Sequence, residues 1–288
     1  MRVLITGATG FIGRYVVAAL LDLGVPVIAA SRSRERAEAM PWFGRVDWRP
    51  LDLAVPSSDP FQTLGRPDRC LHLAWSGLPD YRGAHHLEEN LPQSLAFLRT
   101  LLAGGLRRLL VAGTCFEYGL QEGEFSEDIE TRPENAYGRA KDALRRALEP
   151  AAAAVGATLQ WARLFYMYGP GQNPNSLFSQ LDRALDEGRA SFDMSGGEQV
   201  RDFLPVERLA GYLARVALQD EVAGVINVCS GEPATVRELV QAHVAERGAA
   251  LTLNLGVYPY PDWEPFRFWG NTAKLQRALS AYDRLSAV

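Results

Sequence analysis

The chain has 288 residues and a formal net charge of −4, with 47% hydrophobic and 22% charged residues. This balance is typical of a globular protein, which excludes a mainly disordered or fibrous chain, and the slight acidity argues against nucleic acid as a partner. No apolar stretch is long enough to cross a membrane, and residues 1–13 lack the charged and apolar regions of a signal peptide. We therefore expect a cytoplasmic protein with no membrane partner.

The three cysteines, Cys70, Cys115 and Cys229, are far apart in the sequence and share no metal-ligand spacing with histidine. This distribution argues against a disulfide framework and against a structural zinc site. We expect no bound metal.

Short apolar runs alternate with amphipathic stretches over the first half of the chain. The pattern predicts strands at residues 3–5, 25–30, 46–48, 69–73, 109–112 and 158–163. It predicts helices at 11–23, 91–102 and 135–153, a short charged helix through residues 36–39, and a kink or break of the last long helix at Pro150. Such alternation indicates an α/β fold, a Rossmann-like doubly wound parallel sheet with helices on both faces.

After about residue 164 the sequence no longer alternates as regularly between apolar runs and amphipathic stretches. Residues 168–175 have the composition of a loop, and three prolines exclude a regular helix from 258–265. Helices are predicted at 176–187, 206–218 and 236–247, with short strands at 191–193, 201–204 and 225–228. We expect an NAD(P)-binding domain over residues 1–163 and a smaller α/β substrate lobe over 164–288 that interleaves with it.

A glycine-rich turn, Thr-Gly-Ala-Thr-Gly-Phe-Ile-Gly at residues 6–13, lies between the first predicted strand and the first predicted helix. Gly7 permits the tight turn, Gly10 lets a diphosphate approach the backbone, and Gly13 lets helix and strand pack closely. The helix N-terminus adds free N–H groups and the positive end of its dipole. This context predicts a dinucleotide-binding site rather than an ordinary βα turn.

The end of the second predicted strand discriminates between NAD(H) and NADP(H). An acidic side chain there would bind the ribose 2′-hydroxyl and repel a 2′-phosphate. The segment has no acid before Glu35, and Ser31, Arg32 and Arg34 can bond a phosphate, so the sequence favours NADP(H) over NAD(H). The alternative is a solvated, basic helix start. Asp52, after the third strand, would touch the adenine or act as a cap.

Tyr137 and Lys141 lie one turn apart near the start of a predicted helix. A lysine ammonium beside a phenol favours the phenolate, so we expect Lys141 to lower the pKa of Tyr137 toward neutral pH. Such a tyrosine can exchange a proton with a carbonyl or alcohol during hydride transfer. The pattern gains weight from its place after the strand that ends at Thr114.

These motifs extend along nearly the whole chain and together resemble a known family. They are TGATGFIG (6–13), Asp-Leu (52–53), Leu-His-Leu-Ala (71–74), Gly-Thr-Cys-Phe-Glu-Tyr-Gly (113–119), Tyr-Gly-Arg-Ala-Lys (137–141), Arg163 with Tyr-Gly-Pro-Gly-Gln (168–172), Arg-Asp-Phe (201–203) and Asn-Val-Cys-Ser-Gly (227–231). The chain resembles the extended short-chain dehydrogenases/reductases of the nucleotide-sugar epimerase/dehydratase/reductase group. The resemblance implies that Thr114 holds the substrate oxygen, with Tyr137 as acid/base and Lys141 as its helper.

The resemblance also implies which side chains meet the ligands and how copies of the chain associate. The cofactor would contact Gly7, Thr9, Gly10, Phe11, Ile12, Gly13, Ser31, Arg32, Arg34, Asp52, Leu53, Leu73, Ala74, Trp75, Tyr137, Lys141 and Phe165. A nucleoside-diphosphate sugar, the expected substrate, would contact Ser76, Cys115, Glu117, Tyr166, Asn175, Arg201 and Arg267. A homodimer through helices near 85–104 and 136–154 is expected, and His72 is expected to be a core residue.

The chain departs from the family pattern at positions that matter for chemistry. Family dehydratases carry Asp-Glu directly after the threonine, where this chain has Cys115 and Phe116, so water elimination lacks its acid and base. Glu117 stands where an apolar residue is usual and would bind a sugar hydroxyl or cap a turn. Tyr166 replaces an asparagine that commonly contacts the substrate phosphate. Cys115 is expected to be a buried thiol rather than a proton donor.

Trp75, Tyr81, His85 and His86 follow the fourth predicted strand, at the carboxyl edge of the sheet where ligands bind. The two aromatic rings can stack on a sugar or base. Paired histidines in a loop are more often solvated than functional, and we expect that arrangement here.

We consider three functions from two classes. The leading hypothesis is an NADPH-dependent reductase that delivers hydride to C4 of a nucleoside-diphosphate 4-keto-6-deoxy sugar, with Tyr137 as general acid. The second is an NAD-dependent nucleotide-sugar 4-epimerase, which shows no net cofactor turnover. The third is a non-catalytic dinucleotide-binding sensor or scaffold, because a fold alone does not fix function.

Overall fold

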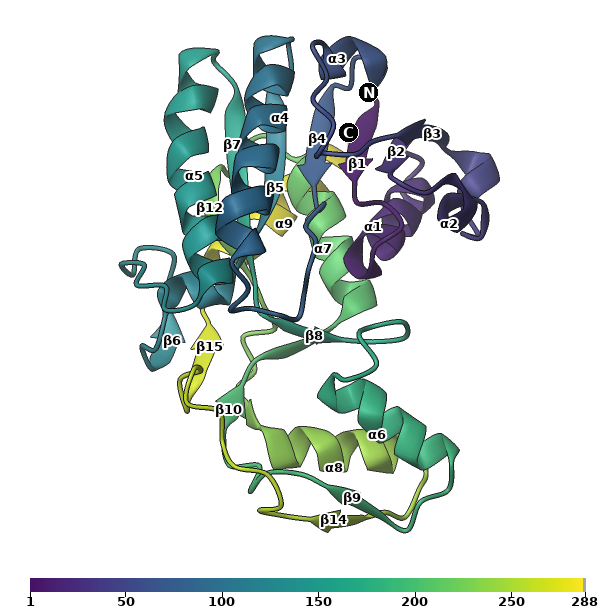
Figure 1. Cartoon of the computed structure of the whole chain (residues 1–288), viewed down its shortest axis with the longest axis vertical. Helices are drawn as coiled ribbons and strands as arrows, with labels where there is room; N and C mark the ends of the chain where they lie inside the picture. Colours follow the sequence, from purple (N-terminus) through teal and green to yellow (C-terminus); the bar gives the residue numbers. More distant parts are fainter. Residues whose placement is uncertain (287–288) are drawn as a thin grey trace.

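A seven-stranded parallel sheet forms the centre of the protein, in the strand order β12-β7-β5-β4-β1-β2-β3 (Figure 1). The computed structural model describes residues 1–286. The strands are β1 (Val3–Thr6), β2 (Val27–Ser31), β3 (Asp47–Pro50), β4 (Arg69–His72), β5 (Arg108–Thr114), β7 (Thr158–Leu164) and β12 (Gly224–Val228). The predicted Rossmann-like sheet is confirmed. Its order reverses between β1 and β4, which is where such sheets bind ligands.

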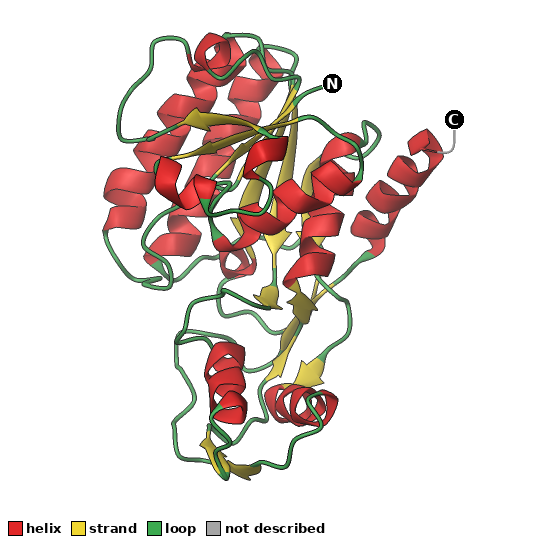
Figure 2. Cartoon of the chain, turned by 90° about the vertical axis from the view of Figure 1, so that its right-hand side faces the viewer, coloured by secondary structure: helices red, strands yellow, loops and turns green. Residues whose placement is uncertain are grey.

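Helices cover both faces of this sheet (Figure 2). One face carries α1 (Phe11–Asp22), α7 (Val206–Leu218) and α9 (Ala273–Ser286), and the other carries α3 (Pro60–Thr63), α4 (Leu91–Ala103) and α5 (Ala136–Ala154). The short α2 (Arg34–Glu38) follows β2. The break considered at Pro150 does not occur, because α5 runs through this exposed residue, where water can solvate the freed carbonyl.

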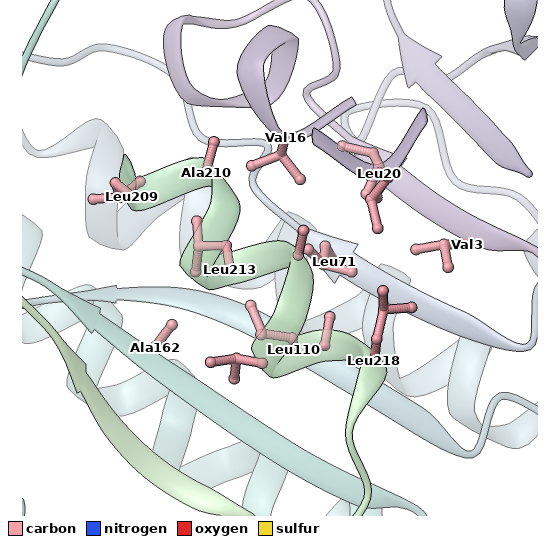
Figure 3. Packing of buried hydrophobic residues seen from close by; sticks show 14 of the residues in the cluster. Val3, Val16, Leu20, Leu71, Leu110, Ala162, Leu209, Ala210, Leu213 and Leu218 are labelled. Carbon is pink, nitrogen blue, oxygen red and sulfur yellow. The ribbon is translucent and has the colours of Figure 1, made fainter. Parts of the chain in front are cut away.

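The largest apolar core lies between α1, α7 and the sheet (Figure 3). Val16 and Leu20 of α1 face Leu213 of α7, and Leu71 and Leu110 of the sheet close the cluster from below. All five side chains are at most 1% exposed. Because α7 comes from the second half of the chain, that half contributes directly to the cofactor domain.

Elements that follow the expected boundary at residues 163/164 therefore belong to both domains. Beyond it, α7, β12 and α9 return to the central sheet and its helical layer. The helix α9 was not predicted; it buries Leu275, Ala278 and Leu279 against α7. This helix places the end of the described chain on the cofactor domain rather than in the lobe.

The remaining elements form a small lobe beyond the carboxyl ends of the strands. It contains α6 (Leu177–Asp186), α8 (Val236–Glu246) and the strand pairs β9 (Ser191–Asp193) with β14 (Thr252–Asn254) and β10 (Val200–Arg201) with β13 (Ala234–Thr235). Two further pairs join the lobe to the sheet, β8 (Tyr166–Tyr168) with β11 (Phe203–Pro205) and β6 (Gly123–Phe125) with β15 (Phe268–Gly270).

The single strand predicted at 201–204 is split into β10 and β11. Between them, the buried Asp202 carboxylate accepts hydrogen bonds from the backbone N–H groups of Ser230 and Gly231 at 2.7 and 2.9 Å. This bond pattern turns the chain from the lobe toward the sheet. Three single-turn helices complete the fold, η1 (Phe43–Arg45), η2 (His86–Asn90) and η3 (Cys115–Tyr118). Within residues 1–286, no helix is long and apolar enough to span a bilayer.

Candidate active site

The glycine turn between β1 and α1 leaves room for a ligand to approach the backbone. Gly7 has φ +69°, and a Cβ atom there would lie 2.9 Å from the backbone of Ala74. A Cβ atom on Gly13 would collide with the Gly7 carbonyl, so only glycine permits this packing. Gly10 is the N-cap of α1 and offers no side-chain bond to the first N–H groups. The turn therefore fits a cofactor diphosphate at the helix N-terminus.

A cavity of about 450 Å³ opens at the carboxyl ends of β1, β4, β5 and β7. The residues predicted from the sequence that line it are Gly7, Gly10, Phe11, Ile12, Gly13, Leu73, Trp75, Thr114, Cys115, Tyr137, Lys141, Phe165 and Tyr166. Its lining also includes Leu78, Pro79, Tyr81, Phe116, Met167, Gln172 and Asn173. The glycine motif and the catalytic motif thus meet in one cavity.

Other predicted ligand contacts lie outside this lining. They are Thr9, Ser31, Arg32, Arg34, Asp52, Leu53, Ala74, Ser76, Glu117, Asn175, Arg201 and Arg267. Asp52 Oδ1 accepts the Ala54 N–H at 3.1 Å, so this carboxylate acts as a cap. Asn175 is exposed on the loop whose Gln172 and Asn173 do reach the cavity.

Three elements bring the catalytic residues together. Thr114 ends β5 and is the N-cap of η3, and Tyr137 and Lys141 lie on the first turns of α5. The helix begins at this point because Asn135 Oδ1 accepts the Gly138 N–H at 2.8 Å. Lys141 Nζ donates to the Ala112 carbonyl at 2.8 Å and lies 5.9 Å from the centre of the Tyr137 ring.

The electrostatics of this group correct one expectation. The pKa of Tyr137 is raised above its ordinary value, chiefly by burial, and Tyr81 adds to the effect. We expected Lys141 to lower it, but the ammonium points toward Ala112 and the Trp75 ring rather than the phenol. Burial also lowers the pKa of Lys141 to about 7, opposed by the nearby Glu117 carboxylate. The phenol is therefore protonated at neutral pH in this protein.

Glu117 is a structural residue rather than a substrate contact. Its side chain is 0% exposed, and its carboxylate accepts bonds from Arg163 Nε at 2.7 Å and from Trp161 Nε1 at 2.9 Å. It also accepts the Thr114 N–H at 2.8 Å, completing a capping box on η3. The expectation that it binds a sugar hydroxyl is corrected by this enclosure, and its alternative role as a cap is what the structure shows.

Phe116 and Tyr81 line the cavity beside Tyr137, and Trp263, which is not part of the lining, packs against both of their rings. The Phe116 ring lies 4.8 Å from Tyr81, 6.4 Å from Tyr137 and 6.0 Å from Trp263, measured between ring centres. Trp263 was not predicted, because it belongs to an irregular, proline-rich segment with no periodicity. Cys115 is a buried thiol, as expected, and burial raises its pKa.

The two arginines expected to meet a diphosphate lie apart from the cavity lining. The Arg201 side chain is 3% exposed and donates to Glu264 Oε2 at 2.9 Å and to the Phe266 carbonyl at 3.0 Å. Arg267 is exposed. The Tyr166 hydroxyl is buried without a hydrogen-bond partner among residues 1–286, and the nearby Glu264 adds to the burial that raises its pKa.

His72, at the end of β4, and His85 and His86, which follow it, are buried to different extents. His72 is a core residue, as expected, fully buried with Nδ1 2.9 Å from Thr6 Oγ1. His86 is also fully buried, so the expectation of a solvated pair is wrong for it. Its neighbour His85 is half-buried. Solvation fails at His86 because η2 folds its ring under Trp75.

In the segment that would discriminate NADP(H) from NAD(H), two of the three predicted side chains bond to neighbouring side chains. Ser31 Oγ accepts the Trp48 Nε1–H at 3.0 Å, and Arg34 pairs with Glu38 at 2.7 Å on the exposed face of α2. Arg32 is exposed at the end of β2. Of the two arginines predicted to meet a 2′-phosphate, Arg32 is thus the one without a carboxylate partner in the described chain.

Comparisons with known proteins agree with this geometry. A sequence model of the NAD dependent epimerase/dehydratase family matches residues 3–229. A dTDP-6-deoxy-L-talose 4-dehydrogenase (NAD(+)) of Aggregatibacter actinomycetemcomitans is 31% identical over 94% of this chain and 99% of the relative. A dTDP-6-deoxy-L-talose 4-dehydrogenase (NAD(P)(+)) of Kitasatospora kifunensis is 28% identical over 91% of this chain and 86% of the relative.

Solved structures share the fold over the full length of the chain. MoeE5 in complex with UDP-glucuronic acid and NAD superposes with a TM-score of 0.76 and 26% identity, covering 98% of this chain and 93% of that chain. Its bound ligands are a nucleotide sugar and a nicotinamide dinucleotide, the two ligand classes expected from the sequence.

Proposed function

The chain belongs to the NAD-dependent epimerase/dehydratase family, and we propose that it is an oxidoreductase acting at C4 of a nucleoside-diphosphate 6-deoxy sugar. In the direction of reduction, its substrate is the 4-keto sugar and its product the C4 alcohol. The observation that carries the proposal is one cavity in which Thr114, Tyr137 and Lys141 meet, while Cys115 and Phe116 stand where an eliminating enzyme needs an acid and a base.

Each catalytic residue has a role that follows from its surroundings. The nicotinamide ring of the bound cofactor supplies the hydride in reduction and accepts it in oxidation. Tyr137 donates its phenolic proton to the C4 oxygen, because burial keeps that proton in place at neutral pH. Thr114 holds the same oxygen through its hydroxyl. Lys141 supports Tyr137 from the next turn of α5.

The walls of the cavity favour a 6-deoxy sugar. Phe116 and Tyr81 line the cavity beside Tyr137, and the face of the Phe116 ring can pack against a methyl group. A hydroxyl or carboxylate packed against the Phe116 ring would lose its water without gaining a partner from that ring. The names of the two curated relatives specify 6-deoxy-talose substrates, which supports the same choice.

We further propose that the cofactor is NADP(H) in preference to NAD(H). No acidic side chain lies between the end of β2 and Glu35, and the exposed Arg32 can pair with a 2′-phosphate. The Arg32→Ala variant tests this. We expect about a tenfold loss of kcat/KM with NADPH and little change with NADH, as one charge-assisted bond is removed. Equal losses with both cofactors, or a wild type that prefers NADH, would contradict the preference.

The experiment for the main proposal is turnover with a panel of nucleoside-diphosphate 4-keto-6-deoxy sugars. We expect consumption of one reduced cofactor for each alcohol formed. The family description also covers epimerases, and a 4-epimerase as the second function predicts tightly retained oxidised cofactor with sugar epimers interconverted and no net change in reduced cofactor. Binding of cofactor with no turnover on any sugar would instead leave a dinucleotide sensor or scaffold.

We also propose a homodimer through α4 and α5. These helices lie side by side on one outer face of the sheet (Figure 1), and α4 keeps Leu95 and Phe97 only partly buried. A second copy could bury this surface further. Light scattering of the purified protein tests the proposal, with a mass twice that of the chain expected and a monomer mass contradicting it.

A further inference from the structure

Trp75 links the catalytic lysine to a buried histidine. Its indole ring lies against the Lys141 ammonium, with Nζ 3.8 Å from the ring centre. At its other edge, Nε1–H donates to Nδ1 of His86 over 3.0 Å. The Tyr137 ring centre lies 6.0 Å from that of Trp75. Trp75 therefore contacts the catalytic residue Lys141 on one side and His86 of η2 on the other.

The hydrogen bonds of His86 fix its protonation state. An indole N–H can only donate, so Nδ1 of His86 is the acceptor and the ring proton resides on Nε2. Nε2–H then donates to the Asp80 carbonyl over 2.6 Å. His86 is fully buried, and burial lowers its pKa below the ordinary value. A neutral imidazole in this tautomer satisfies both bonds, whereas a protonated ring would direct an N–H at the indole N–H.

The Lys141 ammonium has few compensating groups around it. The side chain is 2% exposed and its nitrogen donates to the Ala112 carbonyl. The titratable groups that face it are Glu117 on η3, His72 on β4, Tyr137 on the same helix and His86 on η2. Glu117 is bonded to Arg163, and burial lowers the pKa of both histidines, so they are neutral. The Trp75 ring is thus a direct partner of the charge, and such contacts strengthen when desolvated.

We propose that Trp75 and His86 are positioning residues for Lys141: His86 holds the indole ring in place, and the ring holds the lysine ammonium at the Ala112 carbonyl, 5.9 Å from the centre of the Tyr137 ring. This role rests on the proposed oxidoreductase function, because it acts through the catalytic lysine. Ser76 and Asn90 brace the arrangement, since Ser76 Oγ donates to Asn90 Oδ1 at 2.8 Å and Asn90 Nδ2 donates to the Ser76 carbonyl at 3.0 Å.

The first test needs neither cofactor nor substrate. A nearby ammonium quenches indole emission, so the emission that Trp75 contributes, obtained as the difference between wild type and Trp75→Phe, should rise as Lys141 loses its proton. We expect a midpoint near pH 7, from the pKa of Lys141. The Lys141→Met variant should lack this titration. A titration that persists in Lys141→Met would assign it to His86 and overturn the contact with the lysine.

Substitutions at His86 separate positioning from simple packing. His86→Asn can keep an acceptor near the position of Nδ1, whereas His86→Leu cannot. We expect His86→Asn to retain the titration of Trp75 emission and His86→Leu to lose or displace it. If the two variants behave alike, with both folded by circular dichroism, the histidine does not hold the indole through its hydrogen bond.

The second test uses the pH profile of kcat/KM for the cofactor, which reports groups of the free enzyme. In Trp75→Leu the ammonium loses its ring partner, so we expect the alkaline limb to move about one unit to lower pH. Trp75→Phe keeps a ring and should shift less. Trp269→Phe, on β15, is the matched control and should not shift. An unchanged limb in Trp75→Leu would overturn the inference.

The two proposals fail in different ways. If the wild type turns over no nucleotide sugar, the proposed function fails, and the emission titration still decides whether Trp75 contacts the Lys141 ammonium. If the wild type is active but the emission and the pH limb are both insensitive to Trp75 and His86, only the positioning role fails.

Discussion

At the scale of single residues, burial holds the phenol of Tyr137 in the form that can donate a proton. Its raised pKa keeps the phenol protonated, and a protonated phenol is a proton donor to a developing alkoxide. The same burial lowers the pKa of Lys141 to about 7. Two neighbours on one helix are thus shifted in opposite directions by a single cause, the loss of water around each charged form.

Replacing the phenol tests its role in proton transfer. Tyr137→Phe should lower kcat by about 10²–10⁴-fold, because it removes the general acid but little else. Cofactor affinity, measured by titration calorimetry, should change little. Tyr212→Phe, on α7 and away from the cavity, is the control. A kcat for Tyr137→Phe close to that of the control would show that another group supplies the proton.

Lys141 should make folding stability depend on pH. Its folded-state pKa of about 7 lies below the unfolded value of about 10.4, so between these values the unfolded chain holds a proton that the folded chain has lost. The free energy of unfolding therefore rises with pH in this window, by up to about 1.4 kcal/mol per unit, and the gain is lost as pH falls through 7.

Urea unfolding of the wild type and of Lys141→Met measures this contribution. We expect the wild type to gain stability relative to the variant from about pH 7 to 9, in the window set by the two pKa values. Parallel pH dependence of the two proteins would mean that Lys141 keeps an ordinary pKa.

Motif residues could be predicted from the sequence, but their partners could not. Tyr137 and Lys141 were identified from their spacing, and both line the cavity. The pairing of Glu117 with Arg163 was not, because the two are 46 positions apart and only the β5–β7 register brings them together. The burial of His86 was likewise invisible, since a His-His pair in a loop carries no periodic signal.

At the scale of elements, η3 depends on a buried ion pair. Glu117 caps this helix directly after β5 and holds Thr114 by its backbone, while Arg163 on β7 neutralises the carboxylate. Both side chains are at most 2% exposed. The position of the substrate-holding threonine is thus set by a charge pair between adjacent strands.

Breaking this pair should be costly. Glu117→Gln should lower the free energy of unfolding by about 3–5 kcal/mol, because Arg163 is left as an uncompensated buried charge. Glu130→Gln is the control, since its pair with Arg132 is exposed on both sides, and it should change stability by about 0–1 kcal/mol. Chemical denaturation compares the two. Equal small effects would show that water reaches Arg163.

Most long elements were predictable, whereas α9 and most of the short strands were not. Apart from β3, the strands of the sheet have apolar runs that indicate buried strands, α7 was predicted with the bounds that the structure shows, and the short strand predicted at 191–193 is β9. The pairs β10–β13 and β8–β11 have two or three residues per strand, too few to show alternation. They form because the lobe brings their partners together, which is tertiary information.

At the scale of the whole molecule, the second half of the chain completes the cofactor domain. The α7 helix packs beside α1 on the same face of the sheet (Figure 3), and α1 carries the glycine turn at its N-terminus. The lobe and the cofactor site are therefore connected through α7, which follows β11 directly. Loss of packing in this layer should weaken the whole fold.

Leu213→Ala tests this packing. The side chain is fully buried between the two halves of the chain, so its truncation should cost about 2–5 kcal/mol of unfolding free energy. Leu255→Ala, at a leucine that is 43% exposed in the lobe, should cost much less. Urea unfolding provides both values. A small effect at Leu213 would mean that α7 is not part of the cooperative core.

Isotope transfer tests whether this protein reduces C4 of a nucleoside-diphosphate 4-keto-6-deoxy sugar with hydride from a nicotinamide cofactor. Reduced cofactor carrying deuterium at both C4 positions of the nicotinamide ring is incubated with the enzyme and the 4-keto sugar. The account predicts one deuterium at C4 of the sugar for each cofactor oxidised, observed by mass spectrometry and NMR. A C4 alcohol that carries no deuterium, or a 4-keto sugar that stays unreduced while the labelled cofactor is not consumed, would contradict it.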